Sequence, residues 1–187
     1  MQFQETDFES AWLICPDRVE DERGFFARTW CEREFTTRGL NSQLVQCNIS
    51  QNRLAGTLRG MHWQAMPQPE TKLVRCTSGT IFDVIVDVRP DSGSFGHWQG
   101  FELSAENRRA LYIPAGFAHG FVTLEENSEV LYQMSDFYEP TLARGFHHQD
   151  TAVCIQWPHE IRVVSRRDRS LPSLSAAVAE CEERRAA

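Results

Sequence analysis

Short runs of apolar and β-branched residues, separated at small intervals by Gly, Pro, Asn and Asp, constrain the fold of this chain most strongly. The runs have the length and composition of ordinary strands. The candidate strands are AWLIC (11–15), GFFARTW (24–30), LVQCNIS (44–50), KLVRCT (72–77), IFDVIVDV (81–88), FELS (101–104), ALYI (110–113), GFVTL (120–124) and EVLYQMSDFY (129–138). We expect a largely antiparallel, all-β protein whose sheet is closed or doubled to hide its edges.

The run 81–88 is the clearest of these strands. Its apolar residues at even positions alternate with Asp83 and Asp87, so we expect one mostly buried apolar face. Ser78-Gly79 precedes the run and predicts a tight turn, which would join 72–77 to 81–88 as a hairpin.

Helices are expected only near the two ends of the chain. Cys31 to Arg38 can form one short helix, and SLSAAVAECEERR (173–185) is typical of a helical or frayed tail. The 187 residues, of which 41% are hydrophobic, suffice for one core but not for two ordinary domains. We expect a single domain over 1–187, with 173–187 as its tail.

Charge and composition argue against several classes of function. The 19 Lys and Arg face 26 Asp and Glu, for a net charge of -7, which is opposite to what a nucleic-acid binder needs. No apolar run approaches the ~20 residues that cross a bilayer, and the N-terminus lacks the pattern of a signal peptide. The six cysteines are scattered without C-x-x-C spacing, as in a cytoplasmic protein with reduced thiols.

Three stretches carry more polar residues than plain strands and turns need. The first combines QCNIS (46–50) with GTLRGMHWQ (56–64). On an extended strand Arg59 and His62 would point to opposite sides, but Gly60 lets the backbone bend between them. Taken alone, Arg59 could be a surface cation and His62 an ordinary strand histidine.

The second stretch, PAGFAHGF (114–121), places His119 between two aromatic residues, after a turn fixed by one proline and two glycines. The pattern P-x-G-x-x-H resembles the second motif of cupins, which are double-sheet jelly rolls with a site inside the barrel. A metal-binding cupin would also carry H-x-H and a following Glu, whereas Trp63 and Gln64 follow His62. We therefore expect no metal site.

The third stretch is EVLYQ (129–133), with Tyr138 shortly after it. Strand alternation would place Tyr132, Met134 and Asp136 on one face. Both tyrosines could equally be half-buried strand residues with no part in a site.

Taken together and in order, the motifs of this chain resemble those of the dTDP-4-dehydrorhamnose 3,5-epimerase family over about residues 10–174. The matching segments are DERGFF (21–26), QCNIS (46–50), GTLRGMHWQ (56–64), Lys72, IFDVIVDVR (81–89), SFG (94–96), IPAGFAHGF (113–121), Tyr132 and SRRD (165–168). The resemblance implies a cupin-type double-sheet jelly roll with short helices. It also implies an isomerase that, without cofactor or metal, converts dTDP-4-dehydro-6-deoxy-D-glucose to dTDP-4-dehydro-L-rhamnose.

The resemblance implies an acid–base mechanism through an enolate. His62 would remove the proton, and a hydrogen bond from Asp168 would fix its tautomer and stabilise the imidazolium. Lys72 would face the negative charge on the ketone oxygen. Tyr132 would protonate the opposite face, which requires a site that brings its pKa closer to neutrality. His119 would contact the sugar or support the Asp168–His62 pair.

The resemblance also implies a set of substrate-binding residues, namely Arg23, Phe26, Gln46, Asn48, Arg59, His119 and Tyr138. Arg59 and Arg23 would bind the diphosphate. Gln46 and Asn48 would donate to the phosphate or nucleoside, and Phe26 would pack on the base. Family members pair through their N-terminal strands, so we expect a homodimer in which Phe26 or Arg23 reaches the neighbour's site.

Two local departures from the family pattern leave details open. Arg28 stands where many members carry a Glu that contacts the nucleoside, so the nucleotide base is not fixed. The run FHHQD (146–150) replaces a run similar to Trp-Asn-Asp, and we expect its His147 and His148 to be solvent-exposed.

Three other functions remain open from the sequence. Relatives with this fold and base invert only C3 or only C5, or accept other 4-keto deoxysugars. A metal-dependent cupin would use His62 and His119, and a binding-only cupin would hold a nucleotide sugar without converting it. The sequence does not fix the pathway, although L-rhamnose for a surface polysaccharide or a glycosylated metabolite would suit the leading hypothesis.

Overall fold

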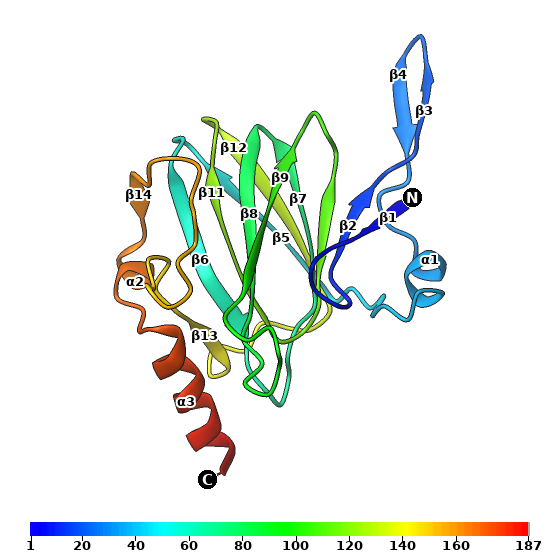
Figure 1. Cartoon of the computed structure of the whole chain (residues 1–187). Coiled ribbons are helices and arrows are strands. Elements are labelled where there is room, and N and C mark those ends of the chain that lie inside the picture. Colours follow the sequence, from blue (N-terminus) through cyan, green and yellow to red (C-terminus); the bar gives the residue numbers. More distant parts are fainter. Residues whose placement is uncertain (187) are drawn as a thin grey trace.

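Two antiparallel sheets face each other and carry the cavity described below (Figure 1). The computed structural model describes residues 1–186. Within these residues, the first sheet contains, in spatial order, β1 (Gln2–Glu5), β2 (Trp12–Cys15), β10 (Ala110–Ile113), β7 (Lys72–Ser78), β12 (Ser128–Met134) and β5 (Gln46–Asn52). The second contains β13 (Ala143–Gly145), β6 (Thr57–Gln64), β11 (Phe117–Thr123), β8 (Thr80–Asp87) and β9 (Trp98–Ser104), with β14 (Val163–Val164) parallel to β6. The all-β prediction is confirmed.

The helices are short and lie near the ends of the chain, as expected. They are α1 (Glu32–Thr36), α2 (Arg166–Arg169) and α3 (Leu174–Ala186). The start of α3 packs through Leu174, Ala177 and Val178 onto the outer face of the second sheet. Residue 187, the end of the predicted tail, lies outside the described residues.

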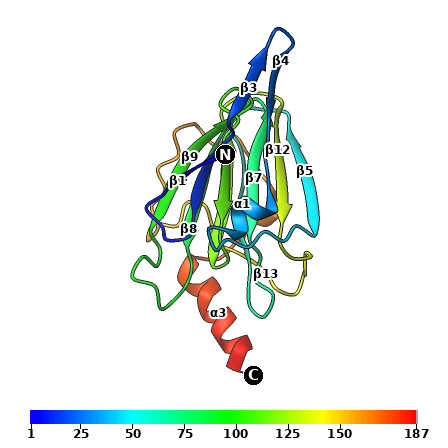
Figure 2. The same cartoon turned by 90° about the vertical axis from the view of Figure 1, so that its right-hand side faces the viewer.

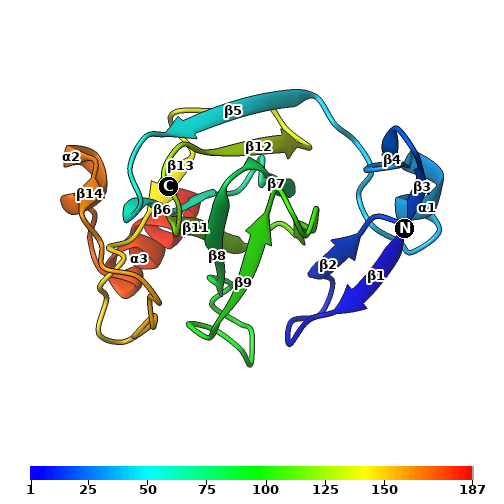
Figure 3. The same ribbon diagram turned by 90° about the horizontal axis from the view of Figure 1, so that it is seen from above.

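A separate hairpin projects from the body of the molecule (Figures 1 and 2). It pairs β3 (Arg18–Asp21) with β4 (Gly24–Ala27). Viewed from above, the N-terminal strands and this hairpin lie at one end of the molecule, and β14 with α2 lies at the other (Figure 3). The hairpin is therefore remote from any site beside β14 in its own chain.

Strand β8 is buried on both faces, which the alternation in its sequence did not predict. Ile81 and Ile85 face the core between the sheets, while Val84 and Val86 pack beneath α3 and the segments that precede it. Asp83 and Asp87 have no exposed surface either. The acidic face of this strand points into the protein, so each carboxylate needs partners there.

The predicted hairpin of 72–77 with 81–88 is wrong. β7 pairs with β10 and β12 in the first sheet, whereas β8 pairs with β9 and β11 in the second. The turn at Gly79 thus carries the chain from one sheet to the other. Gly79 has φ +70°, and a Cβ there would meet Ser128 Oγ at 2.5 Å, so both the backbone and the packing require glycine.

Asp87 holds the turn that follows β8. It accepts hydrogen bonds from the Arg89 side chain at 2.8 and 2.7 Å and from the hydroxyls of Ser92 and Ser94. Burial alone would raise the pKa of Asp87, but these hydrogen bonds lower it to about 2. Because this pKa lies below that of an unfolded aspartate, the carboxylate stabilises the fold above pH ~4, and that contribution is lost as the pH falls toward 2.

We therefore expect Asp87→Asn to lower the free energy of unfolding by roughly 2 kcal/mol at pH 7. The difference from wild type should shrink as the pH falls from about 4 to 2, because the wild-type group is then protonated as well. Urea unfolding over this pH range measures it, with the exposed Asp91→Asn as the matched control. A pH-independent difference would show that the charge of Asp87 is not what stabilises this turn.

Candidate active site

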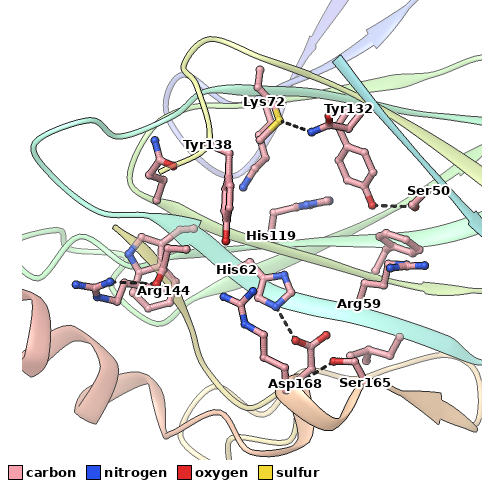
Figure 4. Close-up of a pocket in the computed structure, with 18 of the residues that line it drawn as sticks. Ser50, Arg59, His62, Lys72, His119, Tyr132, Tyr138, Arg144, Ser165 and Asp168 are labelled. Carbon is pink, nitrogen blue, oxygen red and sulfur yellow. Dashed lines mark hydrogen bonds and ion pairs between the residues drawn. The ribbon is translucent and has the colours of Figure 1, made fainter. Parts of the chain in front are cut away.

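A cavity of about 570 Å³ opens between the two sheets, beside β14 and α2. Both sheets contribute side chains to it, as do the loops that follow β12 and β14 (Figure 4). The predicted residues that line it are Asn48, Arg59, His62, Lys72, His119, Tyr132, Tyr138 and Asp168. One cavity thus collects most of the side chains singled out from the sequence.

A bulge in β6 brings Arg59 and His62 to the same cavity. His119 of β11 pairs with His62, but Phe121, two residues further on, pairs with Arg59, three residues away on β6. The extra residue on β6 reverses the alternation that would otherwise separate the two side chains. Gly60 sits in the bulge with φ +125°, and a Cβ there would meet Gly120 Cα at 2.5 Å. The bend expected at Gly60 therefore takes the form of a β-bulge.

Asp168 reaches His62 from 106 residues further along the chain. β14 runs parallel to β6 and places the start of α2 against it, where Ser165 caps the helix by accepting a hydrogen bond from the Asp168 amide. Asp168 Oδ1 lies 2.8 Å from His62 Nε2, and its other oxygen accepts from the Gly60 amide at 3.4 Å. Burial would raise the pKa of Asp168, but His62 and the Gly60 amide hold it below its usual value.

The His62–Asp168 pair has the geometry of a positioned base. The Asp168 side chain is buried, whereas about a third of the His62 side chain is exposed to the cavity. In the tautomer that donates Nε2–H to the carboxylate, His62 Nδ1 keeps its lone pair. This nitrogen is therefore free to accept a proton.

Tyr132 and Lys72 lie on the other wall of the cavity, on β12 and β7 of the first sheet. The Tyr132 hydroxyl is 3.2 Å from Ser50 Oγ. Burial raises the pKa of Tyr132 well above its ordinary value, the reverse of the shift expected from the sequence. Tyr132 thus stays protonated at neutral pH and can act as an acid, which suits the protonation of a carbon far more basic than a phenolate.

His119 forms a second histidine–carboxylate pair that the sequence did not predict. Its Nε2 lies 2.8 Å from Asp83 Oδ2, and both side chains are buried. His119 lines the cavity and its ring meets that of Tyr132 edge-on, with 6.0 Å between centroids. It supports neither Asp168 nor His62 directly. The inward-facing acidic residues of β8 were the signal from which Asp83 could have been found.

The sequence of this chain is similar to those of known proteins over nearly its whole length. Residues 5–176 match the family model described as dTDP-4-dehydrorhamnose 3,5-epimerase. The enzyme of that name from Sinorhizobium fredii is 42% identical over 175 residues, which are 93% of this chain and 90% of that protein. This chain belongs to the dTDP-4-dehydrorhamnose 3,5-epimerase family. The family and the isomerase class predicted from the sequence are confirmed.

Solved structures of this epimerase family share its fold. The dTDP-6-deoxy-D-glucose-3,5-epimerase from Legionella pneumophila, in complex with dTDP-4-keto-L-rhamnose, gives a TM-score of 0.90 at 36% identity and covers 96% of each chain. A 3′-monoepimerase from Streptomyces bikiniensis, in complex with dTDP-quinovose, gives 0.87 at 28% identity, over 96% of this chain and 95% of that one. The predicted jelly roll is confirmed, and the fold is shared by relatives whose names differ in the number of carbons inverted.

Among the described residues, three arginines line the cavity, one that was expected from the sequence and two that were not. Arg59 lines the cavity and donates through Nε to Asn52 Oδ1 at 2.8 Å. Arg144 and the exposed Arg167 also line it, and neither was expected from the sequence. Arg167 is the residue before Asp168 in S-R-R-D, so its place beside a candidate site residue was the available signal.

The remaining predicted epimerase residues are divided between the cavity and the hairpin. Asn48 and Tyr138 line the cavity, and Gln46 lies at its edge, where its Oε1 accepts from the Tyr138 amide at 3.2 Å. Arg23 and Phe26 lie on the projecting hairpin instead, exposed and far from the cavity of their own chain.

The expectation that both histidines of 146–150 are exposed is wrong for His148. Its side chain is buried, its ring stacks on that of half-buried His147, and its carbonyl accepts from Trp157 Nε1 at 3.1 Å. The reason is that Phe146 anchors the segment in the core beneath β6. Burial lowers the pKa of His148, so the ring is neutral at physiological pH.

Proposed function

We propose that this protein converts dTDP-4-dehydro-6-deoxy-D-glucose to dTDP-4-dehydro-L-rhamnose by proton transfer at C3 and C5. The observation that carries the proposal is the placement of His62, backed by Asp168, and Tyr132 on opposite sheets across one cavity. A sugar bound between them presents one face to a base and the other to an acid, which is the requirement for inverting a carbon beside a ketone.

His62 removes the proton and the ketone oxygen gains negative charge as the enolate forms. Lys72, whose side chain is buried on the cavity wall, donates to that oxygen, where a cation stabilises charge far more than it would in water. Tyr132 then donates its proton to the opposite face of the carbon. Because the base, the cation and the acid are side chains of the chain itself, the proposed reaction requires neither cofactor nor metal.

The nucleoside diphosphate lies at the mouth of the cavity in this proposal. Arg59 and Arg167 supply guanidinium groups there, which suit the geometry of phosphate oxygens. Asn48 and Tyr138 offer neutral donors beside them. The Legionella pneumophila relative, which is 36% identical over 96% of each chain, is in complex with a dTDP-sugar, and this supports a dTDP-linked substrate.

The proposed functional unit is a homodimer. Phe26 is 77% exposed on a hairpin that lies far from its own cavity, and Val19 and Phe25 beside it are also exposed. Apolar residues on a projecting hairpin are suited to packing against a second copy of the chain. We infer that the hairpin delivers Arg23 and Phe26 to the partner's cavity, where they bind the diphosphate and the base.

Mixing two inactive variants tests this exchange of hairpins. We expect Arg23→Ala/Phe26→Ala and His62→Ala each to be impaired alone, because each dimer then lacks one component of both sites. Co-refolded at equal amounts, they should regain about a quarter of wild-type activity, since half of the dimers are mixed and each has one complete site. Mixtures no more active than their components would show that each site is built within one chain.

We infer that the protein acts in the cytoplasm. Cys15, Cys31, Cys47, Cys76 and Cys154 are free thiols, the state expected of a reducing compartment. No helix within residues 1–186 is long and apolar enough to cross a membrane.

Incubation of the purified protein with dTDP-4-dehydro-6-deoxy-D-glucose in deuterated water tests the proposed reaction. Two deuterons in an L-configured product mean inversion at both carbons. One deuteron means a single-carbon epimerase, an alternative supported by the 3′-monoepimerase with the same fold. Tight binding without deuterium uptake would mean a binding protein, and loss of activity on chelation would mean a metal-dependent enzyme.

A further inference from the structure

Glu70 is a buried carboxylate in the cavity wall, and it has no role in the reaction proposed above. It lies in the loop between β6 and β7, two residues before Lys72, and lines the same cavity. Its Oε1 lies 2.7 Å from Lys72 Nζ, and the two side chains are only 7% and 9% exposed. A buried ion pair of this kind fixes the ammonium in place, because an unpaired charge there would be costly.

The second oxygen of Glu70 lacks a partner. Oε2 is buried, and no group within residues 1–186 forms a hydrogen bond with it. Native proteins seldom leave such an acceptor unsatisfied, and one found in a ligand cavity points to a donor on the ligand. The torsion about the Cγ–Cδ bond is broad, so a partial rotation can turn Oε2 toward the sugar while Oε1 stays within reach of Lys72.

Glu70 and Lys72 together present an acceptor next to a donor. A ketone with a hydroxyl on the neighbouring carbon presents the complementary pair, because the carbonyl oxygen accepts and the hydroxyl donates. In a 4-keto-6-deoxy sugar this hydroxyl is on C3, whereas the carbon on the other side of the ketone, C5, bears a methyl group that cannot donate. The pair can therefore distinguish the two sides of the ketone.

We propose that Glu70 is a specificity-determining residue that accepts a hydrogen bond from the C3 hydroxyl while it holds Lys72 against the ketone oxygen. The inference rests on the proposed function and adds to it the way in which the sugar is oriented. In this arrangement Lys72 donates to the oxygen on C4, Glu70 marks the side of C3, and C5 with its methyl group falls on the other side.

The test compares the 4-keto-6-deoxy substrate with its 3-deoxy analogue, and the measurement is kcat/KM for deuterium exchange at C5. Wild type should prefer the hydroxylated substrate by about 10- to 100-fold, the range for one hydrogen bond to a charged group. In Glu70→Gln the amide oxygen remains on Lys72 and its NH₂ faces the hydroxyl, so the preference should fall to a few-fold. Glu70→Ala should abolish it, and Glu129→Gln, a matched change outside the cavity, should retain it.

The ratio between the two substrates isolates the contact from any general damage, because a purely structural defect lowers both rates together. Wild-type preference retained in Glu70→Gln would overturn the inference, as would a wild-type protein that exchanges C5 equally well in both substrates. If wild type exchanges neither substrate, the proposed function itself fails. Glu70→Gln preserves side-chain volume, so the ratio can be measured even if Glu70→Ala does not fold.

Discussion

His62→Ala is expected to abolish both deuterium exchange and epimerisation, with rates at least about 10³-fold below wild type. The reason is that, in the proposed mechanism, the imidazole held by Asp168 at 2.8 Å takes the proton from one face of the sugar. Mass spectrometry of the nucleotide sugar after incubation in deuterated water measures this loss directly.

The fold should survive this change, because about a third of the His62 side chain faces the cavity and its neighbours on β6 keep their packing. His97→Ala, which removes an exposed histidine outside the cavity, is the matched control and should retain full activity. Exchange in His62→Ala at a rate within a few-fold of wild type would assign the proton abstraction to another group.

Tyr132→Phe is expected to separate exchange from inversion. His62 still removes a proton and returns a deuteron to the same face, so the recovered substrate becomes labelled. Delivery to the opposite face loses its acid, and formation of the inverted product should fall by about 10²- to 10⁴-fold. NMR of the recovered sugar distinguishes labelled substrate from labelled product.

The matched control is Tyr112→Phe, which removes another buried hydroxyl, one that is hydrogen-bonded to the Asn41 amide outside the cavity. It should leave inversion unchanged. If Tyr132→Phe inverts the sugar at a wild-type rate, a different donor serves the second face. If it loses exchange together with inversion, Tyr132 acts before or during proton removal.

Much of the fold could be predicted from the sequence because local patterns carried it, whereas most of the cavity residues were predicted through the family resemblance. The β-strand runs predicted the sheets, and the structure then places His62 and His119, which the motifs R-G-x-H and P-x-G-x-x-H singled out, opposite each other on neighbouring strands. Strands β1, β3 and β6 were not among the predicted runs, since their residues are too polar for apolar alternation to mark them.

What could not be predicted depends on contacts between distant segments. Gly79 leads from one sheet to the other and packs against Ser128, but a tight turn looks the same in sequence whether or not its strands pair. The approach of Asp168 to His62 depends on a two-residue strand, β14, that has no signal of its own. Without the family resemblance, nothing local would have paired these two residues.

The hydrophobic periodicity of the sequence also could not predict the buried acidic partners of His119 and Lys72. Asp83 and Glu70 are acidic residues that pattern rules assign to a surface, and only the closed sheets show that they face His119 and Lys72. The projecting hairpin was read as part of a strand at 24–30, because its exposed aromatic residues have the composition of a buried strand.

The central claim is that a base and an acid act on opposite faces of one sugar, and the distribution of deuterium in the first turnovers tests it most directly. With wild-type protein in deuterated water, quenched early, the inverted product should carry solvent deuterium at every inverted carbon, because Tyr132 supplies it. The unconverted substrate should carry much less. Product that keeps the original hydrogen at an inverted carbon would mean that one group serves both faces, and would contradict the account.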